Sequence, residues 1–140
     1  MNILYQTHAT ATGGRTGIAA VDDGSLSLSL TTPRELGGPG GEGANPEQLF
    51  VCGYAACFLS ALHFVAGRRK LKLSEASKVS AAVGIGPRTD GAGFGLDIVL
   101  TVIIPDLDKH ITSELVEEAH VSCPYSHLAR EGLDVRLTVA

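Results

Sequence analysis

The sequence has no excess of positive charge, and this absence bears on the class of partner. Among 140 residues, 11 are Lys or Arg and 15 are Asp or Glu, so the formal net charge is −4. A nucleic-acid binder that relies on bulk charge needs the opposite balance. The one basic cluster, at 67–72, is better explained as the positive C-terminal end of a helix. We therefore expect no nucleic-acid partner.

The sequence also lacks the segments that direct a chain to a membrane or out of the cytoplasm. Residues 1–10 contain no basic segment followed by an apolar one, as a signal peptide would. Ser60 and His63 interrupt the most apolar helical stretch, and Gly67 is expected to end it too early for a membrane span. We predict a cytoplasmic protein without a membrane partner, in which three cysteines do not form a structural disulfide framework.

The glycine-rich segment 35–45 lacks the Gly-Lys-Ser/Thr ending of a phosphate-binding loop, so it predicts no nucleotide cofactor. It leads into a helix. Asn45 can cap this helix, Pro46 suits its first position, and Gln48 completes a capping box. We predict that the helix runs to about Ala66 and stops at Gly67.

The remaining pattern predicts an α+β fold with antiparallel sheet, in one domain over residues 1–140. A turn at 22–24 precedes strict alternation that places Leu26, Leu28 and Leu30 on one face of a strand. The expected strands are 3–11, 16–21, 25–31, 77–86, 94–104 and 133–139. A second helix is expected at 106–120, with Ile111, Leu115 and Ala119 on its inner face.

Residues 49–66 are apolar almost all round the expected helix, which is typical of a helix buried on every side. A chain of 140 residues has limited material to cover such a helix, so the pattern indicates a partner subunit. Cys52 and Cys57 lie five positions apart and diverge by roughly 140° around the helix, too far to bond to each other. Cys52 is interpreted as a small buried hydrophobe.

Cys57 is a candidate nucleophile, although the helix dipole cannot activate it. It lies twelve positions beyond the cap, and the dipole acts only over the first turn. A cation must come from elsewhere, and Arg15, flanked by glycines, is the best candidate because it stays charged when buried. A buried guanidinium needs an anionic partner, and Glu47 suits this role.

The spacing of Glu47 and Cys57 supports the predicted dimer. Ten residues of helix separate their Cα atoms by roughly 15 Å, so one arginine cannot comfortably meet both from the same helix. If two copies of the helix packed antiparallel, Glu47 of one chain would lie near Cys57 of the other.

Cys123 follows the second helix, and Pro124 is expected to stop that helix and leave the thiol at an accessible, irregular position. Cys57 and Cys123 can meet only through folding. Peroxide chemistry uses such a pair, because one thiolate attacks and the other resolves the sulfenic acid into a disulfide. Two alternatives stay open: a zinc site at His120, Cys123 and His127, which lacks a close fourth ligand, and a non-enzymatic redox sensor or small-molecule binding module.

Three motifs together resemble the organic hydroperoxide resistance (Ohr) family, within the wider group of osmotically inducible protein C (OsmC). They are LYQTHATATGGR, ELGGPGGEGANPEQLFVCGYAACFLSAL and VSCPYS, in the right order and covering essentially the whole chain. The resemblance implies that Cys57 is the peroxidatic cysteine, Cys123 the resolving cysteine, and Arg15 with Glu47 the activating ion pair. It also implies an intertwined homodimer with a long buried central helix.

The resemblance further implies reduction of organic hydroperoxides, with recycling by a lipoylated protein or dihydrolipoamide rather than glutathione, and with no metal or cofactor. Two places depart from the expected pattern: Cys52 stands where a small residue such as alanine is usual, and the segment 126–132 differs from its usual sequence. We predict that Phe50, Phe58 and Leu62, or neighbours on the same helix, line an apolar route to Cys57 that favours alkyl or fatty-acid hydroperoxides.

Overall fold

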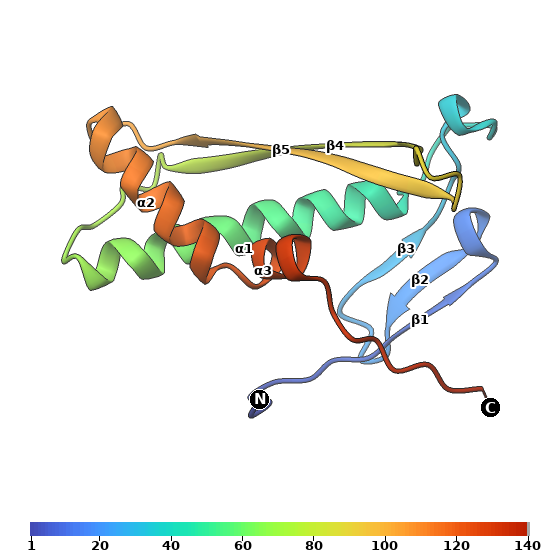
Figure 1. Ribbon diagram of the computed structural model, residues 1–140. Helices are drawn as coiled ribbons and strands as arrows, with labels where there is room; N and C mark the ends of the chain where they lie inside the picture. The colour runs from blue at the N-terminus through green and yellow to red at the C-terminus, as the bar shows by residue number, and fades with distance from the viewer. Residues whose placement is uncertain (140) are drawn as a thin grey trace. The chain divides into compact units, whose positions relative to one another are not determined.

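A computed structural model describes residues 1–139, and the chain forms two compact units, residues 1–49 and residues from Phe50 onward (Figure 1). The first unit contains β1 (Ala9–Thr12), the 3-10 turn η1 (Gly14–Thr16), β2 (Ile18–Val21), β3 (Ser27–Ser29) and the 3-10 turn η2 (Arg34–Leu36). Helix α1 (Pro46–Arg68) begins there. The second unit adds β4 (Lys78–Pro87), β5 (Phe94–Ile103), α2 (Lys109–Ser122) and α3 (Pro124–Glu131). This element content is the predicted α+β class with antiparallel sheets.

The sheet of the first unit has the order β1-β2-β3, and both pairings are antiparallel. The predicted turn is present, because Gly24 has a φ of 76° and donates to the carbonyl of Val21 at 2.9 Å. The prediction of a strand over 3–11 was wrong in extent, since only Ala9–Thr12 pairs with β2. The second strand begins at Ile18 rather than Thr16 because η1 occupies the intervening residues.

The start of α1 follows the predicted capping box. The side chain of Asn45 accepts from the backbone N–H of Gln48 at 2.9 Å, and the Gln48 side chain accepts from the N–H of Asn45 at 3.0 Å. These reciprocal bonds satisfy two donors that a helix start leaves free.

The end of α1 differs slightly from the prediction, because the helix passes through Gly67 and ends at Arg68. Lys70 takes the left-handed conformation, with a φ of 59°. The N–H of Leu71 then donates to the carbonyl of Ala66 at 2.9 Å, and that of Lys70 donates to Gly67 at 3.0 Å. This is a Schellman ending in which lysine occupies the position that glycine usually fills.

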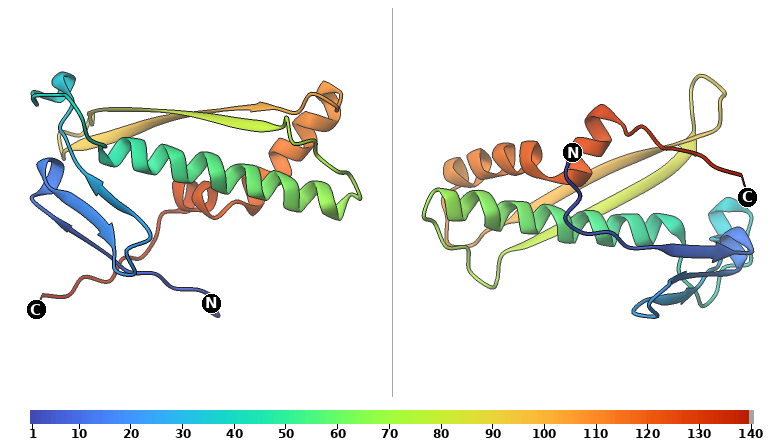
Figure 2. Two further views of the ribbon diagram at one scale, coloured as in Figure 1. Left: turned by 180° about the vertical axis from the view of Figure 1, so that it is seen from behind. Right: turned by 90° about the horizontal axis from the view of Figure 1, so that it is seen from below.

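The second unit has two layers. Strands β4 and β5 form a long antiparallel hairpin, and α1, α2 and α3 lie against one of its faces (Figure 2). The predicted inner face of α2 is confirmed, since Leu115 and Ala119 are fully buried and Ile111 packs against them. The core consists of the following buried apolar residues: Tyr54, Phe58, Ala61, Leu62, Val65, Ala66, Leu73, Ile104, Leu115, Ala119 and Cys123.

Helix α1 is long and apolar enough to cross a membrane, with 23 residues and a mean hydropathy of 1.9 over its most apolar window. The expectation that it ends too early for a span was therefore wrong about length. Core helices of soluble proteins can be equally long and apolar. One side of α1 packs into the core just described. The opposite side, with Cys52 and Ala56, is exposed in the single chain, so Cys52 is not the buried hydrophobe that the sequence predicts.

The C-terminal region differs most from the prediction. The segment expected to be a loop forms α3, in which Pro124 occupies the first turn and Gly132 follows the last residue. The expected strand at 133–139 has no paired neighbour among residues 1–139, and its side chains are exposed. Alternation alone does not make a strand, because the backbone N–H and C=O groups need a partner edge.

Candidate active site

Two sulfur atoms that lie 66 positions apart in the sequence meet in the second unit. The Sγ atoms of Cys57 and Cys123 are 3.5 Å apart, and both residues carry free thiols. Cys57 comes from the middle of α1, and Cys123 lies at the junction where α2 ends and α3 begins. The two sulfur atoms would need to move only a short distance closer to form a disulfide bond.

The two cysteines differ in burial. Cys57 is partly exposed, whereas Cys123 has 0% exposure and belongs to the core. The expectation that Cys123 lies at an accessible position was wrong. Pro124 does not leave an open loop, because it starts α3 and folds the chain back over the thiol.

The surroundings of Cys57 within its own unit favour the thiol over the thiolate. Burial raises the pKa of Cys57, and the neighbouring thiol of Cys123 raises this pKa further. A backbone hydrogen bond from Tyr125 in the first turn of α3 acts in the opposite direction, but the net shift is upward. Because the thiolate is the nucleophile, this unit needs a positive charge supplied to Cys57.

The first unit holds a positive charge in a fixed position. The guanidinium of Arg15 donates from Nη1 to Oε2 of Glu47 at 2.7 Å and from Nη2 to Oε1 at 2.5 Å. This bidentate bond raises the pKa of Arg15 and lowers the pKa of Glu47, so both groups are ionised at neutral pH. The structure thus contains the predicted Arg15–Glu47 ion pair. The Arg15 side chain remains 35% exposed, so a further group can still approach its guanidinium.

Glycines shape the turn that carries Arg15. Gly13 has a φ of 69°, a conformation that other residues rarely adopt. A Cβ atom on Gly17 would lie 1.7 Å from the carbonyl oxygen of Thr12, so only glycine fits there. These glycines allow the tight η1 turn, in which the backbone at Gly17 passes close to Thr12.

Aromatic side chains of α1 and α3 pack together near the two cysteines. Most of this cluster was not predicted from the sequence. Tyr54 and Ser126 share a buried hydrogen bond of 2.9 Å that joins α1 to α3. Tyr125 stacks on Phe50 at 5.9 Å between ring centroids and packs against Tyr54. A proline at the first helical position and a glycine after the last one were the signals that could have revealed α3.

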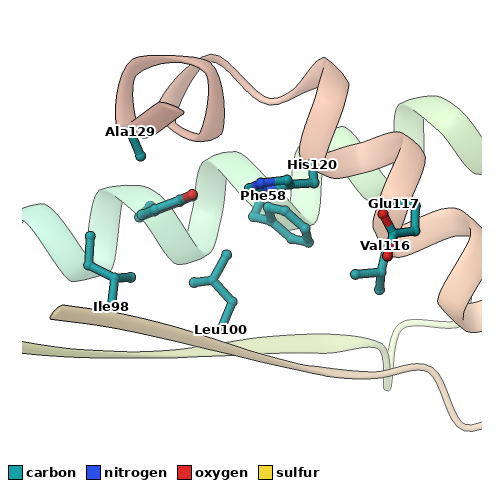
Figure 3. A pocket seen from close by; sticks show the side chains of 8 residues that line it. Phe58, Ile98, Leu100, Val116, Glu117, His120 and Ala129 are labelled. Atoms are coloured by element: carbon teal, nitrogen blue, oxygen red, sulfur yellow. The ribbon is translucent and has the colours of Figure 1, made fainter. Parts of the chain in front are cut away.

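A cavity of about 410 Å³ lies between the helices and the inner face of the hairpin (Figure 3). It is lined by Tyr54, Phe58, Ile98, Leu100, Val116, Glu117, His120 and Ala129. Of the three predicted pocket residues, Phe58 lines this cavity. Leu62 has 0% exposure and fills the core, and Phe50 packs on Tyr125 instead.

Among residues 1–139, no three His, Cys, Asp or Glu side chains converge as metal ligands, and the alternative set of His120, Cys123 and His127 is no exception.

Comparison with known proteins gives consistent matches. The family described as OsmC-like protein matches residues 38–138. An organic hydroperoxide resistance protein of Xanthomonas axonopodis pv. citri is 50% identical over 138 residues, which covers 99% of this chain and 96% of that protein. Crystal structures of organic hydroperoxide resistance proteins from Legionella pneumophila (TM-score 0.87, 44% identity, 96% of each chain) and Bacillus subtilis (TM-score 0.83, 38% identity, 96% and 97%) have the same fold.

Proposed function

Since this chain belongs to the OsmC-like family, among the organic hydroperoxide resistance proteins, we propose that it is a cysteine-based peroxidase that reduces organic hydroperoxides to alcohols. The observation that carries the proposal is the 3.5 Å separation of the Cys57 and Cys123 sulfur atoms. Residues far apart in the sequence are brought to the distance that a peroxide-driven disulfide requires.

The reaction proceeds in two steps. The Cys57 thiolate attacks the distal oxygen of the hydroperoxide, the O–O bond breaks, and the leaving alkoxide takes a proton to become an alcohol. Cys57 is thereby oxidised to a sulfenic acid. The thiol of Cys123 then attacks the Cys57 sulfur, water leaves, and a Cys57–Cys123 disulfide forms. Arg15 lowers the pKa of the Cys57 thiol and stabilises negative charge on the peroxide oxygens.

A homodimer brings the two halves of this chemistry together. The ion pair belongs to residues 1–49, and the thiol pair belongs to the unit that begins at Phe50. We infer that Glu47 and Arg15 of one chain act on Cys57 of its partner. The spacing along α1 supports this inference, since roughly 15 Å separates the Cα atoms of Glu47 and Cys57 on one helix.

Exposed apolar surface in the single chain supports the same dimer. One side of α1 presents Cys52, Ala56 and Phe64 to solvent. The alternating apolar side chains of 133–139 are exposed by 63% or more. A second copy would cover such surfaces, because contiguous apolar surface on a folded chain marks an interface.

We propose that the cavity holds an apolar tail of the substrate, because Phe58, the residue next to Cys57, lines it. Its walls are mostly aliphatic and aromatic, and each buried methylene contributes roughly 0.8 kcal/mol to binding. Alkyl or fatty-acid hydroperoxides offer such groups, whereas hydrogen peroxide does not. Dihydrolipoamide or a lipoylated protein in the cytoplasm is the proposed reductant, because a slim dithiol reaches a disulfide in apolar surroundings better than anionic glutathione does.

Steady-state peroxidase assays test the proposal. The purified protein is given cumene hydroperoxide or hydrogen peroxide, with dihydrolipoamide or glutathione as reductant. We expect multiple turnovers with cumene hydroperoxide and dihydrolipoamide and much slower turnover in the other combinations. A single oxidation without turnover would favour the alternative, a redox sensor that uses the same cysteines. Equal rates with hydrogen peroxide would contradict the assigned substrate class.

A further inference from the structure

The two sulfur atoms of the proposed disulfide are unequally accessible. Cys123 has 0% exposure, and Cys57 is partly exposed. A partner subunit can only add cover, so Cys123 stays buried in every assembly that keeps this fold.

Two backbone hydrogen bonds of Cys123 hold it in its buried position. Its N–H donates to the carbonyl of Ala119 at 2.8 Å, and its own carbonyl accepts from the N–H of His127 at 2.9 Å. Exposure of this sulfur would therefore require the junction of α2 and α3 to unwind. The buried hydrogen bond between Tyr54 and Ser126 also fixes the start of α3 to α1.

We propose that the reductant attacks only the Cys57 sulfur and that Cys123 is always the leaving group. This inference rests on the proposed function, because it concerns how the Cys57–Cys123 disulfide is reopened. Thiol–disulfide exchange depends on which sulfur an incoming thiolate can reach, and here only Cys57 is within reach. Cys57 thus meets both the oxidant and the reductant.

The bonds and electrons balance with a dithiol as the reductant. One of its thiolates forms a bond to Sγ of Cys57, the Cys57–Cys123 bond breaks, and its electron pair goes to Sγ of Cys123, which takes a proton. The second thiol of the reductant then attacks its own sulfur in the mixed disulfide. Cys57 leaves as a thiolate, and the dithiol departs as a cyclic disulfide, oxidised by two electrons.

A trapping experiment tests the direction of attack. The Cys52→Ala protein, which keeps only Cys57 and Cys123, is oxidised with diamide and then reacted briefly with 2-mercaptoethanol. A monothiol lacks the second thiol that would complete the exchange. The reaction is quenched with acid, and free thiols are alkylated with N-ethylmaleimide. Trypsin then separates peptide 35–68, which carries Cys57, from peptide 110–130, which carries Cys123.

At the earliest time points we expect the 2-mercaptoethanol adduct on peptide 35–68 and the maleimide on peptide 110–130, in at least about tenfold excess over the reverse pattern. An adduct on Cys123, alone or in equal share, overturns the inference and leaves the proposed function intact. If neither diamide nor an organic hydroperoxide joins the two sulfurs, the proposed disulfide and this inference fall together. The wild-type protein, mapped by fragmentation of the same peptides, controls for the Cys52 substitution.

Discussion

The Arg15–Glu47 ion pair and the Cys57–Cys123 thiol pair belong to different compact units. In residues 1–49, a glycine-rich turn and the first turn of α1 hold Arg15 and Glu47 as a partly buried ion pair. In the unit from Phe50 onward, aromatic and aliphatic side chains bring Cys57 and Cys123 together in the core. The first unit contains no cysteine, and the surroundings in the second raise the pKa of Cys57.

This difference explains why neither unit is sufficient for the proposed chemistry. Burial brings the sulfur atoms close enough to form a disulfide, but the same burial disfavours the thiolate. An ion pair keeps its charge in partly exposed surroundings and needs no apolar core. In the proposed dimer, the ion pair of one chain would act on the thiol of its partner, so that each group keeps the environment it requires.

The largest effect is expected from removal of the sulfur that meets the substrate. Cys57→Ser should abolish turnover, because a serine hydroxyl at neutral pH does not replace a thiolate. Cys123→Ser should still consume about one hydroperoxide per site and then stall as a sulfenic acid. Stopped-flow measurement of hydroperoxide consumption checks both results. Cys52→Ala is the matched control and should retain nearly full activity; full turnover by Cys57→Ser would contradict the assignment.

The second-largest effect is expected when the ion pair and the thiol are inactivated in different chains of one dimer. Neither Cys57→Ser chains nor Glu47→Arg chains should be active alone. If Glu47 acts across the interface, a heterodimer of the two regains one intact site, so random exchange should restore about a quarter of wild-type activity. Mixed chains are assayed after exchange is verified by native mass spectrometry. No recovery would place Glu47 in the same chain as the cysteine it serves.

A smaller effect is expected within the second unit. Tyr54→Phe leaves the buried hydroxyl of Ser126 without its partner, at a cost of about 1–3 kcal/mol in the free energy of unfolding. The looser junction should slow disulfide formation several-fold and let excess hydroperoxide oxidise Cys57 to the sulfinic acid. Mass spectrometry of the peroxide-treated protein measures this product. Tyr5→Phe, at an exposed position, is the control, and equal oxidation in both variants would deny the hydrogen bond a positioning role.

Local signals predicted the elements whose structure is decided locally. Asn45 and Gln48 form the expected capping box because both partners lie within one turn. The two strands predicted at 77–86 and 94–104 form β4 and β5, which pair with each other along their whole length. Arg15 and Glu47 could be paired from the sequence, because a guanidinium that folding removes from water needs an anionic partner.

Features that depend on distant partners were not predictable in the same way. Residues 133–139 alternate as a strand does, but alternation does not show which edge would pair with them. The burial of Cys123 depends on α3 folding back over the α2 end, and its helical signal at Pro124 was interpreted only as a stop. Cys52 lies on the side of α1 that a single chain leaves exposed, which an all-round apolar pattern cannot reveal.

We propose that Arg15 of the first unit converts the partly exposed thiol of Cys57 in the second unit into a thiolate. The most direct measurement is the titration of Cys57 by thiolate absorbance in the Cys52→Ala background, with and without Arg15→Met. Cysteine ordinarily titrates at about 8.5. We predict a pKa of Cys57 below that value with Arg15 present and above it with methionine, because burial and the neighbouring Cys123 thiol then raise the pKa without an opposing cation. An identical pKa in both proteins would contradict the account.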